Sequence, residues 1–496
     1  MPSSNDVYDN PLIRRYASKA MSERWGPMRK FRTWRKLWLA LAEAQYELKM
    51  PGDDGATPRI RPEQIEELAA HIDDVDLRRA AEWERKKRHD VMAHIETLAE
   101  VAPKAHDIIH LGATSCFVTD NADLILMRES LHQVCETLAA VIDAMGRFAS
   151  QWKDEPTLGF THFQPAQLTT IGKRACLWLY DLILDLQELE RRRDELPFRG
   201  VKGTTGTQAS FLALFRGDHE KVKKLDRLVS RKAGFSRIFP VTGQTYTRKV
   251  DTQILDSLSG LAQTAHKWGS DLRLLAHRQE IDEPFEVDQV GSSAMAYKRN
   301  PMRAERMCSL ARYVMGLPAM AAQTHATQWF ERTLDDSACR RLYLPQAFLA
   351  TDAVLRLALN LVTQRTGPDS LGLVVNRDVI ARNVREQLPY MITENLMMAA
   401  VQSGQSRQEV HEVVRTHSHA VTAKVKAGTG STAELLKALE DEPAFDKVDF
   451  AAFASQTPKD YVGRAPQQVV EFLGDYVEPI RRRYAASLGM SEELEV

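Results

Sequence analysis

The stretch LYLPQAFLATDAVLRLALNLV, residues 342–362, decides how the rest of the chain must be organised. Its only charged residues are Asp352 and Arg356. Apolar side chains therefore fall on nearly every side of the helix that this stretch predicts, and such a helix is buried on most sides. A lone five-helix bundle leaves its outer helices half exposed, so we expect other copies of the chain to cover this helix in a symmetric homo-oligomer.

Five stretches share the length of this helix and its scarcity of glycine and proline. They cover residues 121–153, 166–195, 248–279, 302–330 and 337–365. As helices of about 30 residues they would each span about 45 Å, far longer than the usual 11 to 12 residues. Side-by-side packing is the natural way to bury such helices. The sequence therefore predicts an all-α protein built around a bundle of long helices.

The regions on either side of these stretches are expected to form separate domains, because 496 residues are too many for one hydrophobic core. Helical periodicity predicts helices at 28–49 and 63–86, before the bundle. After Gly367 we expect shorter, more polar helices. The predicted limits are 1–114 for an N-terminal helical domain, 115–367 for the central bundle and 368–496 for a C-terminal helical domain.

Composition excludes several classes of protein. The formal net charge of -1 argues against a general nucleic-acid or membrane-surface binder. None of the five cysteines forms a C-x-x-C pair, and the N-terminus lacks signal architecture, so we expect reduced thiols in a cytoplasmic protein. The uncharged run 313–330 contains Pro318 and His325, which favours a buried helix over a membrane span. No histidines have the spacing of a helical zinc site, so no metal is expected.

Polar clusters fall in the connections between the long stretches, and two of them have alternative interpretations. GVKGTTG, residues 200–206, is either a backbone-amide nest for an anion or a plain interhelical turn, with equal weight on spacing alone. GSSAMAYKRNP, residues 291–301, is either a structural turn or a catalytic loop. In the second case a serine takes a proton while Lys298 and Asn300 stabilise negative charge.

The loop GSSAMAYKRNP resembles the signature loop of the fumarase/aspartase superfamily. Further segments resemble the adenylosuccinate lyase family within it, and most of all its animal-type branch. These segments are RHDVMAH (88–94), HLGATSC (110–116), THFQPAQLTTIGKR (161–174), GVKGTTGTQASF (200–211), TGQTYTRK (242–249), QWFERTLDDS (328–337) and SRQEVHE (406–412). The resemblance extends from about residue 14 to about residue 468.

The resemblance implies a fold of three helical domains, in which four chains form a homotetramer with a twenty-helix core and sites built from three chains. It implies a C–N lyase of purine nucleotide biosynthesis that needs no cofactor. Such an enzyme eliminates fumarate from adenylosuccinate, giving AMP. It also eliminates fumarate from the succinylated aminoimidazole carboxamide ribotide, giving the free carboxamide ribotide. The implied partners are therefore a small nucleotide and further copies of the chain, with no nucleic acid and no membrane.

The resemblance also assigns roles to residues of this chain. The catalytic residues are Ser292 as general base, His162 as general acid, and His89 and Lys298 as their supports. Contacts to substrate carboxylates, phosphate and ribose are assigned to Arg15, Tyr16, Arg88, Asp90, Thr114, Ser115, Thr161, Gln244, Asn300, Arg306, Arg332, Ser337 and Arg341. The family loop carries proline where this chain has Ala296, so we expect a more mobile loop.

Two alternatives remain at the level of sequence. One is another lyase of the superfamily, such as argininosuccinate lyase or fumarase, against which the arginines expected to bind phosphate argue. The other is a catalytically silent helical scaffold. The joint presence of Ser292, His162, His89 and Lys298 argues against the scaffold.

Overall fold

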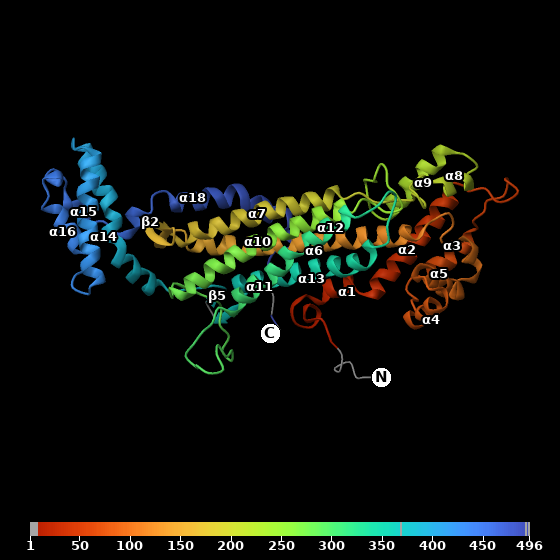
Figure 1. The fold of residues 1–496 in the computed structure, drawn as a ribbon, viewed down its shortest axis with the longest axis horizontal. Helices are drawn as coiled ribbons and strands as arrows, with labels where there is room; N and C mark the ends of the chain where they lie inside the picture. Colours follow the sequence, from red (N-terminus) through yellow and green to blue (C-terminus); the bar gives the residue numbers. More distant parts are fainter. Residues whose placement is uncertain (1–7, 368–369, 492–493, 495–496) are drawn as a thin grey trace.

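The chain forms an elongated bundle of long helices with smaller helices at both ends (Figure 1). This architecture comes from a computed structural model, which describes residues 8–367, 370–491 and 494. The bundle helices are α6 (Ser115–Gln151), α7 (Ile171–Glu195), α10 (Lys249–His277), α11 (Met302–Gly316), α12 (Pro318–Ala326) and α13 (Asp336–Thr363). The predicted all-α class and the central bundle are confirmed.

One of the five predicted long helices is broken. The stretch 302–330 is divided between α11, which ends at Gly316, and α12, which begins at Pro318. Proline has no backbone N–H and fits the first position of a helix, where that donor would have no intrahelical acceptor. The prediction of a continuous helix was therefore wrong, because Pro318 starts a new helix.

Helix α13 is buried by its own chain. From Ala347 to Thr363 only Arg356 is not buried. Helices α1, α6, α10, α11 and α12 and the segment η1 all pack against it. The expectation that other copies are needed to cover this helix was therefore wrong. Among the described residues it is also the one helix long and apolar enough to cross a membrane. However, 78% of its most apolar stretch of 18 residues is buried inside the protein, as in a core helix.

The N-terminal helices gather at one end of the bundle. They are η1 (Leu12–Tyr16), α1 (Lys19–Arg24), α2 (Pro27–Glu47), α3 (Pro62–Ala70), α4 (Leu77–Lys87), α5 (Asp90–Val101) and η2 (Pro103–Ile108), and α9 (His219–Lys232) packs on α2 after the short α8 (Ala209–Leu214). The predicted helix at 63–86 is two helices, α3 and α4, with a break between them. The fully buried Trp34 and Trp38 anchor α2 in this region.

A β-hairpin stands at the opposite end of the bundle, where the sequence predicted only a connection. Strand β1 (Pro156–Thr161) pairs antiparallel with β2 (Gln164–Thr170), from Pro156 opposite Thr170 to Thr161 opposite Gln164. The two-residue turn is His162–Phe163. The other strands are very short: β3 (Ile281–Asp282) pairs with β6 (Val374–Val375), and β4 (Arg365–Gly367) with β5 (Ser370–Leu371).

The region after Gly367 has two parts. Helices α14 (Arg377–Gln402), α15 (Arg407–Lys426), α16 (Glu434–Glu440) and α17 (Phe450–Ala454), with η3 (Pro443–Phe445) and η4 (Pro458–Tyr461), enclose a second apolar core beyond the hairpin end. With 26 residues α14 is not a short helix, contrary to expectation. The final elements, α18 (Ala465–Phe472), η5 (Leu473–Val477), α19 (Glu478–Arg483) and η6 (Ala485–Ser487), return to α6 and α7. The domain limits stay a prediction.

Candidate active site

A polar cleft opens where several bundle helices meet the N-terminal helices, and we call it the rod-end cleft. Its volume is about 580 Å³. Helices α2 and α5 form one side, and the beginnings of α6 and α13 form the other. The predicted site residues that line it are Arg88, His89, Asp90, Ser115, Arg332, Ser337 and Arg341. The fold thus brings together residues from three separate sequence segments.

A buried network of charges fixes the floor of the rod-end cleft. The Arg248 guanidinium donates to both carboxylate oxygens of Asp120, at 3.1 and 3.0 Å, and to Asp336 at 2.8 Å. Arg340 donates to Asp251 at 2.7 Å and pairs with Asp123 at 3.0 Å. Burial opposes the charge on Asp120, but the charges of Arg248 and Arg340 and the Arg248 hydrogen bonds together outweigh it and lower the pKa of that carboxyl. The network therefore joins α6, α10 and α13 through fixed ions.

This network also places the ligand-facing side chains of α13. Asp336 and Arg340 are buried in it, and each directly precedes a residue that lines the cleft, Ser337 and Arg341. The Arg341 guanidinium reaches across the cleft to Asp90 at 2.9 Å. Arg341 thereby connects the second turn of α13 to the first turn of α5.

His89 caps the N-terminus of α5 and faces Ser115. Its Nδ1 accepts a hydrogen bond from the Met92 N–H at 3.3 Å. In the neutral ring the proton therefore lies on Nε2, which is 3.3 Å from the Ser115 hydroxyl. The ring is held as a hydrogen-bond donor pointing toward Ser115, at the edge of the cleft.

Gln244 links two further predicted residues. Its side-chain amide donates to the Thr114 hydroxyl at 3.2 Å, and its carbonyl oxygen accepts from Arg332 at 2.7 Å. The Nε of Arg332 is buried and has no hydrogen-bond acceptor among the described residues. A buried donor without an acceptor carries an energetic cost that an anionic ligand would remove.

His162 lies on the tip of the hairpin, apart from the rod-end cleft. Both turn residues are left-handed, with φ of 52° at His162 and 56° at Phe163. Hairpin turns of this type favour Asn and Gly, so a His–Phe pair is strained. The strained turn holds His162 and Thr161 exposed on the surface. The residues that line the rod-end cleft include none from this hairpin.

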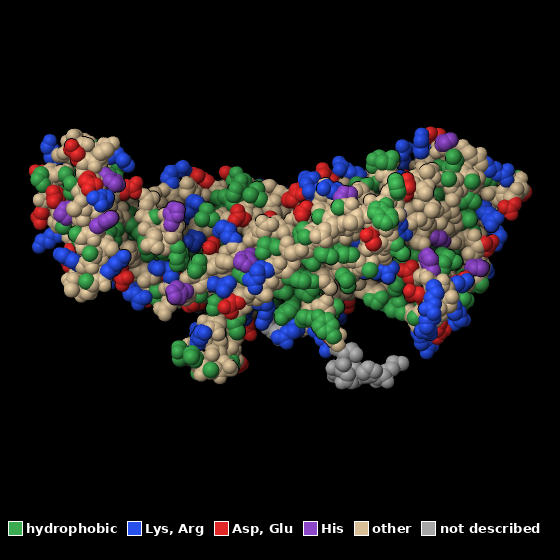
Figure 2. Space-filling view, viewed as in Figure 1, with side chains coloured by type: hydrophobic (Ala, Val, Ile, Leu, Met, Phe, Trp, Pro, Cys, Tyr) green, Lys and Arg blue, Asp and Glu red, His purple; other side chains and the backbone are tan. Residues whose placement is uncertain are grey.

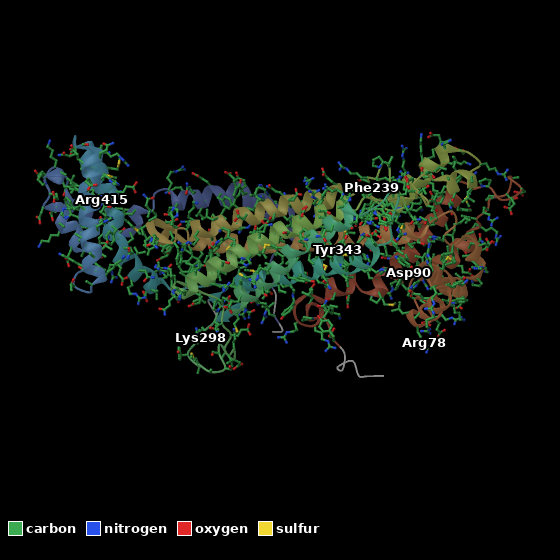
Figure 3. All side chains as sticks on the ribbon, viewed as in Figure 1. Arg78, Asp90, Phe239, Lys298, Tyr343 and Arg415 are labelled. Atoms are coloured by element: carbon green, nitrogen blue, oxygen red, sulfur yellow. The ribbon has the colours of Figure 1, made fainter. Side chains whose placement is uncertain are left out.

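Ser292, Lys298 and Asn300 lie on a loop that projects from the bundle. Figure 3 places Lys298 on this loop and Asp90 toward the opposite end of the molecule. The Ser292 Oγ accepts hydrogen bonds from the backbone N–H groups of Met295 at 3.1 Å and Ala294 at 3.4 Å. Such donors favour negative charge on the serine oxygen. The Asn300 side chain donates to the Gly291 carbonyl at 2.9 Å, which closes the base of the loop.

Arg15, Tyr16 and Arg306 form a third group outside the cleft. They lie where η1 packs beside α11 and α13. The Arg306 guanidinium is 5.8 Å from the centre of the Tyr16 ring, and the Arg15 guanidinium is 6.0 Å from it. In one chain the predicted site residues are therefore divided among the cleft, the hairpin tip, the projecting loop and this N-terminal group.

The structure also bears on two further ligand sites considered from the sequence, an anion site in the GVKGTTG loop and a metal site. Within GVKGTTG the Lys202 ammonium is buried against Asp226 at 2.5 Å, and the Val201 N–H donates to the same carboxylate at 2.8 Å. This loop is therefore an interhelical turn stabilised by the buried Asp226 carboxylate, not an open group of backbone amides that could bind an anion. Within the part of the chain that the structure describes, no group of three His, Cys, Asp or Glu side chains is placed to hold a metal ion.

Comparisons with known proteins place these groups in a family. A lyase family matches residues 28–316, and the C-terminal region of adenylosuccinate lyase matches residues 389–472. The chain is 51% identical over 473 residues to an adenylosuccinate lyase of Saccharomyces cerevisiae, which covers 94% of both chains. The chain belongs to the adenylosuccinate lyase family. Identity is 50% over 472 residues with the Schizosaccharomyces pombe protein and 45% over 493 residues with that of Schistosoma mansoni, covering 94% and 99% of both chains.

Solved structures show that this member of the adenylosuccinate lyase family has the fold of related enzymes. A fumarate lyase from Mesorhizobium superposes with a TM-score of 0.77 at 21% identity, covering 95% of this chain and all of the other. A 3-carboxy-cis,cis-muconate lactonizing enzyme from Pseudomonas putida has a TM-score of 0.78 at 20% identity and covers 96% of this chain. At such identities the likeness concerns the fold alone.

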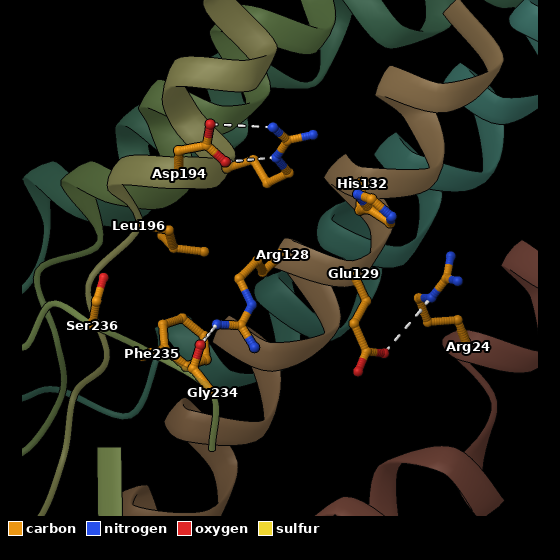
Figure 4. Close-up of a pocket in the computed structure, with 10 residues that line it drawn as sticks. Arg24, Arg128, Glu129, His132, Asp194, Leu196, Gly234, Phe235 and Ser236 are labelled. Atoms are coloured by element: carbon orange, nitrogen blue, oxygen red, sulfur yellow. Dashed lines mark hydrogen bonds and ion pairs between the residues drawn. The ribbon is translucent and has the colours of Figure 1, made fainter. Parts of the chain in front are cut away.

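A second pocket of this adenylosuccinate lyase family member is less suited to a ligand. It has a volume of about 500 Å³ and lies between α6 and the turn that follows α9 (Figure 4). Arg128 donates to the Gly234 carbonyl, and Arg193 holds Asp194 through two hydrogen bonds of 2.7 and 3.1 Å. Its arginines are therefore already engaged, whereas the rod-end cleft keeps donors without acceptors.

Sequence reasoning missed several charged residues of the rod-end cleft, including Lys30 and Asp123. Lys30 stands in the basic first turn of an amphipathic helix, where a solvated lysine is expected. Asp123 lies within a long apolar stretch of α6. Burial raises the pKa of the Asp123 carboxyl although Arg340 opposes that shift. The available signal for Asp123 was its place one helical turn after the buried Asp120.

Proposed function

We propose that this chain is an adenylosuccinate lyase of purine nucleotide biosynthesis. It cleaves the C–N bond of adenylosuccinate to release fumarate and AMP, and performs the same elimination on the succinylated aminoimidazole carboxamide ribotide. The observation that carries the proposal is the rod-end cleft of about 580 Å³, which His89 and Arg332 line, with Gln244 bonded to Arg332. Full-length similarity to adenylosuccinate lyases supports it.

Ser292 is the proposed general base. The elimination removes a proton from Cβ of the succinyl group, and the electron pair forms the new C=C bond of fumarate as the C–N bond breaks. The two N–H groups that donate to the Ser292 Oγ stabilise the oxygen in its charged form. Lys298 is exposed on the same loop and supplies positive charge for the carboxylate that gains charge when the proton leaves.

His162 is the proposed general acid. It gives its proton to the departing nitrogen, and an imidazole suits this task because its unperturbed pKa of about 6.5 lies near working pH. The strained turn presents the ring outward, where it can enter a site on a neighbouring molecule. His89 donates from the rod-end cleft and helps to set the charge on His162.

The other residues bind the substrate. Thr114, Ser115, Gln244 and Asn300 hold carboxylates. Arginine binds phosphate oxygens through paired donors, which suits Arg332 and Arg341. The remaining contacts to phosphate, ribose and base are assigned to Arg15, Tyr16, Arg88, Asp90, Thr161, Arg306 and Ser337.

A homotetramer with shared sites joins the separated groups. The hairpin tip and the projecting loop carry the proposed acid and base, yet neither reaches the rod-end cleft of the same chain (Figure 3). Large apolar side chains are exposed along the bundle, including Leu177 at 52% and Leu184 at 46% on α7 and Leu342 at 61% on α13. Figure 2 shows apolar surface over α11 and α13. Surface of this kind marks contacts between chains.

A cytoplasmic location is also part of the proposal. All five cysteines are free thiols, four of them buried. Burial raises the pKa of the Cys116 thiol to about 11, which keeps it protonated and unreactive at neutral pH. Free thiols of this kind suit a reducing compartment.

One assay tests the proposed activity. The purified protein is incubated with adenylosuccinate, and the absorbance change that accompanies AMP formation is followed. Turnover of adenylosuccinate with none of argininosuccinate or malate is expected. Turnover of either of those compounds in place of adenylosuccinate would assign the chain to another lyase of the superfamily. No turnover of all three would support a silent scaffold.

A further inference from the structure

Lys30 is a half-buried cation in the rod-end cleft, and it has no acidic partner among the described residues. It lies in the first turn of α2 and lines the cleft together with Arg341 and Asp123. Its ammonium lies 5.4 Å from the centre of the Phe31 ring and 5.2 Å from that of Trp34. Among the described residues no acceptor lies within hydrogen-bonding or ion-pair distance of this ammonium.

The surroundings of Lys30 make this arrangement costly without a ligand. Burial lowers the pKa of Lys30, the nearby charges of Asp123 and Asp90 oppose that shift, and the charges of Arg341 and Arg340 add to it. Trp34 is fully buried, so aromatic rings rather than water cover one side of the ammonium. A desolvated ammonium that contacts only rings retains strong attraction for an anion that enters the cleft.

The cationic groups of the cleft that have no acidic partner indicate what kind of anion fits there. Arg248 and Arg340 are engaged in the buried network, and Arg341 is engaged by Asp90. Among the described residues Lys30 has no carboxylate partner, and the buried Nε of Arg332 has no acceptor. The cleft thus offers two unused cationic donors, and Arg341 becomes a third when it exchanges Asp90 for a ligand. A phosphate group has the charge and the oxygen atoms to satisfy all three.

We propose that Lys30 binds the phosphate group of the nucleotide, together with Arg332 and Arg341. This role rests on the proposed function, because it names the part of the substrate that enters this side of the cleft. Lysine acts here as a point charge, whereas the arginines supply paired donors.

Phosphate dependence separates this role from a structural one. In Lys30→Met an apolar chain of similar length occupies the space beside Phe31 and Trp34, so the fold is kept. We expect this variant to bind AMP about 10- to 100-fold more weakly, since a charge-assisted contact is lost. Binding of adenosine, which has no phosphate, should not change. Lys30→Arg should recover part of the AMP affinity.

The matched control is Lys36→Met, which removes an exposed lysine from the same helix outside the cleft. It should alter neither ligand's affinity. The melting temperature of Lys30→Met should equal or exceed that of the parent protein, because a half-buried charge without an acidic partner is removed. A fall in melting temperature with equal losses for AMP and adenosine would overturn the proposal. Unchanged AMP affinity would overturn it as well. A variant in which only the affinity for fumarate falls would also overturn it.

Inorganic phosphate separates failure of this proposal from failure of the proposed function. Phosphate binding is measured by calorimetry on the parent protein and on Lys30→Met. If the parent binds phosphate through Lys30 but does not convert adenylosuccinate, the phosphate site stands and the proposed function fails. If the parent converts adenylosuccinate but phosphate and AMP bind equally well to Lys30→Met, Lys30 has no such role and the proposed function stands.

Discussion

The rod-end cleft and the projecting loop differ in how much of their geometry one chain can fix. In the cleft, side chains from α6, α10 and α13 are tied by buried ions such as Arg248 with Asp120. In the loop, Ser292 and Asn300 are held by bonds to the loop's own backbone, and Lys298 is exposed. The cleft is ready to bind, whereas the loop is prepared for chemistry but has no substrate beside it.

This difference suggests a division of labour between binding and chemistry. Binding requires a rigid arrangement of donors, which a packed network supplies before the ligand arrives. Chemistry requires a base and an acid that reach the substrate only when it is bound, and these lie on a loop and a hairpin tip. A chain that separates the two functions needs a neighbouring copy to join them.

Removal of the proposed base or acid should have the largest effect. Ser292→Ala and His162→Ala are each expected to lower kcat by at least about 100-fold, because each proton transfer loses its carrier. His162 is exposed and Ser292 is only half-buried, so the folded structure should persist, and the dissociation constant for AMP should stay within about threefold of the parent value. Steady-state kinetics and calorimetry measure the two quantities. A near-normal kcat in either variant would remove that residue from its role.

Disruption of the buried network should strongly weaken the structure and ligand binding of the cleft and leave the structure of the projecting loop unchanged. Arg340→Met leaves the carboxylates of Asp251 and Asp123 without their partner. Removal of one member of a buried ion pair costs about 3–5 kcal/mol. The expected result is a large fall in melting temperature with weaker AMP binding. The control Arg191→Met breaks an exposed pair with Glu188 and should cost less than about 1 kcal/mol. Equal effects of the two changes would contradict the account.

Low pH should destabilise the packing of α2 against α5 beside the cleft, through protonation of His94. This ring stacks on Phe31 at 3.7 Å, and burial lowers its pKa to about 4. In the unfolded chain the histidine has its ordinary pKa of about 6.5. The His94 contribution to the free energy of unfolding is therefore fully present above that pH. It falls as the pH drops toward 4, because the unfolded state then binds a proton that the folded state does not. The loss at pH 5 is about 2 kcal/mol. Thermal unfolding of His94→Phe at pH 7 and pH 5 should show a smaller difference than the parent protein. An unchanged difference would contradict this explanation.

The smallest effect is expected at Ala296 in the projecting loop. Proline at this position would limit the loop's unfolded conformations and stabilise it by about 0.4–1 kcal/mol. Ala296→Pro should keep kcat within about twofold of the parent. Limited digestion with trypsin should cut more slowly after Lys298 and Arg299, which are exposed. Equal cleavage rates would show that the alanine does not loosen the loop.

The sequence predicted the bundle more reliably than its local exceptions. Sequence reasoning found α6, α7, α10 and α13 from their length and their few glycines and prolines. It missed the break at Pro318, because apolar spacing continues across it, and the hairpin, because His162 and Phe163 are not turn-forming residues. The motifs located the cleft residues, but Lys30 belongs to no motif and is recognised only by its burial. Contacts between chains leave no periodic signal, so the joining of cleft and loop rests on the family resemblance.

Complementation between two inactive variants tests the shared site most directly. Ser292→Ala lacks the proposed base, and Arg332→Ala lacks a proposed binding residue of the cleft. The two proteins are mixed, dissociated, reassociated and assayed with adenylosuccinate. If base and cleft come from different chains, random assembly places both intact residues in about a quarter of the sites, so the mixture should regain about a quarter of the parent activity. If the mixture regains no activity although mixed oligomers form, base and cleft belong to the same chain and the account is wrong.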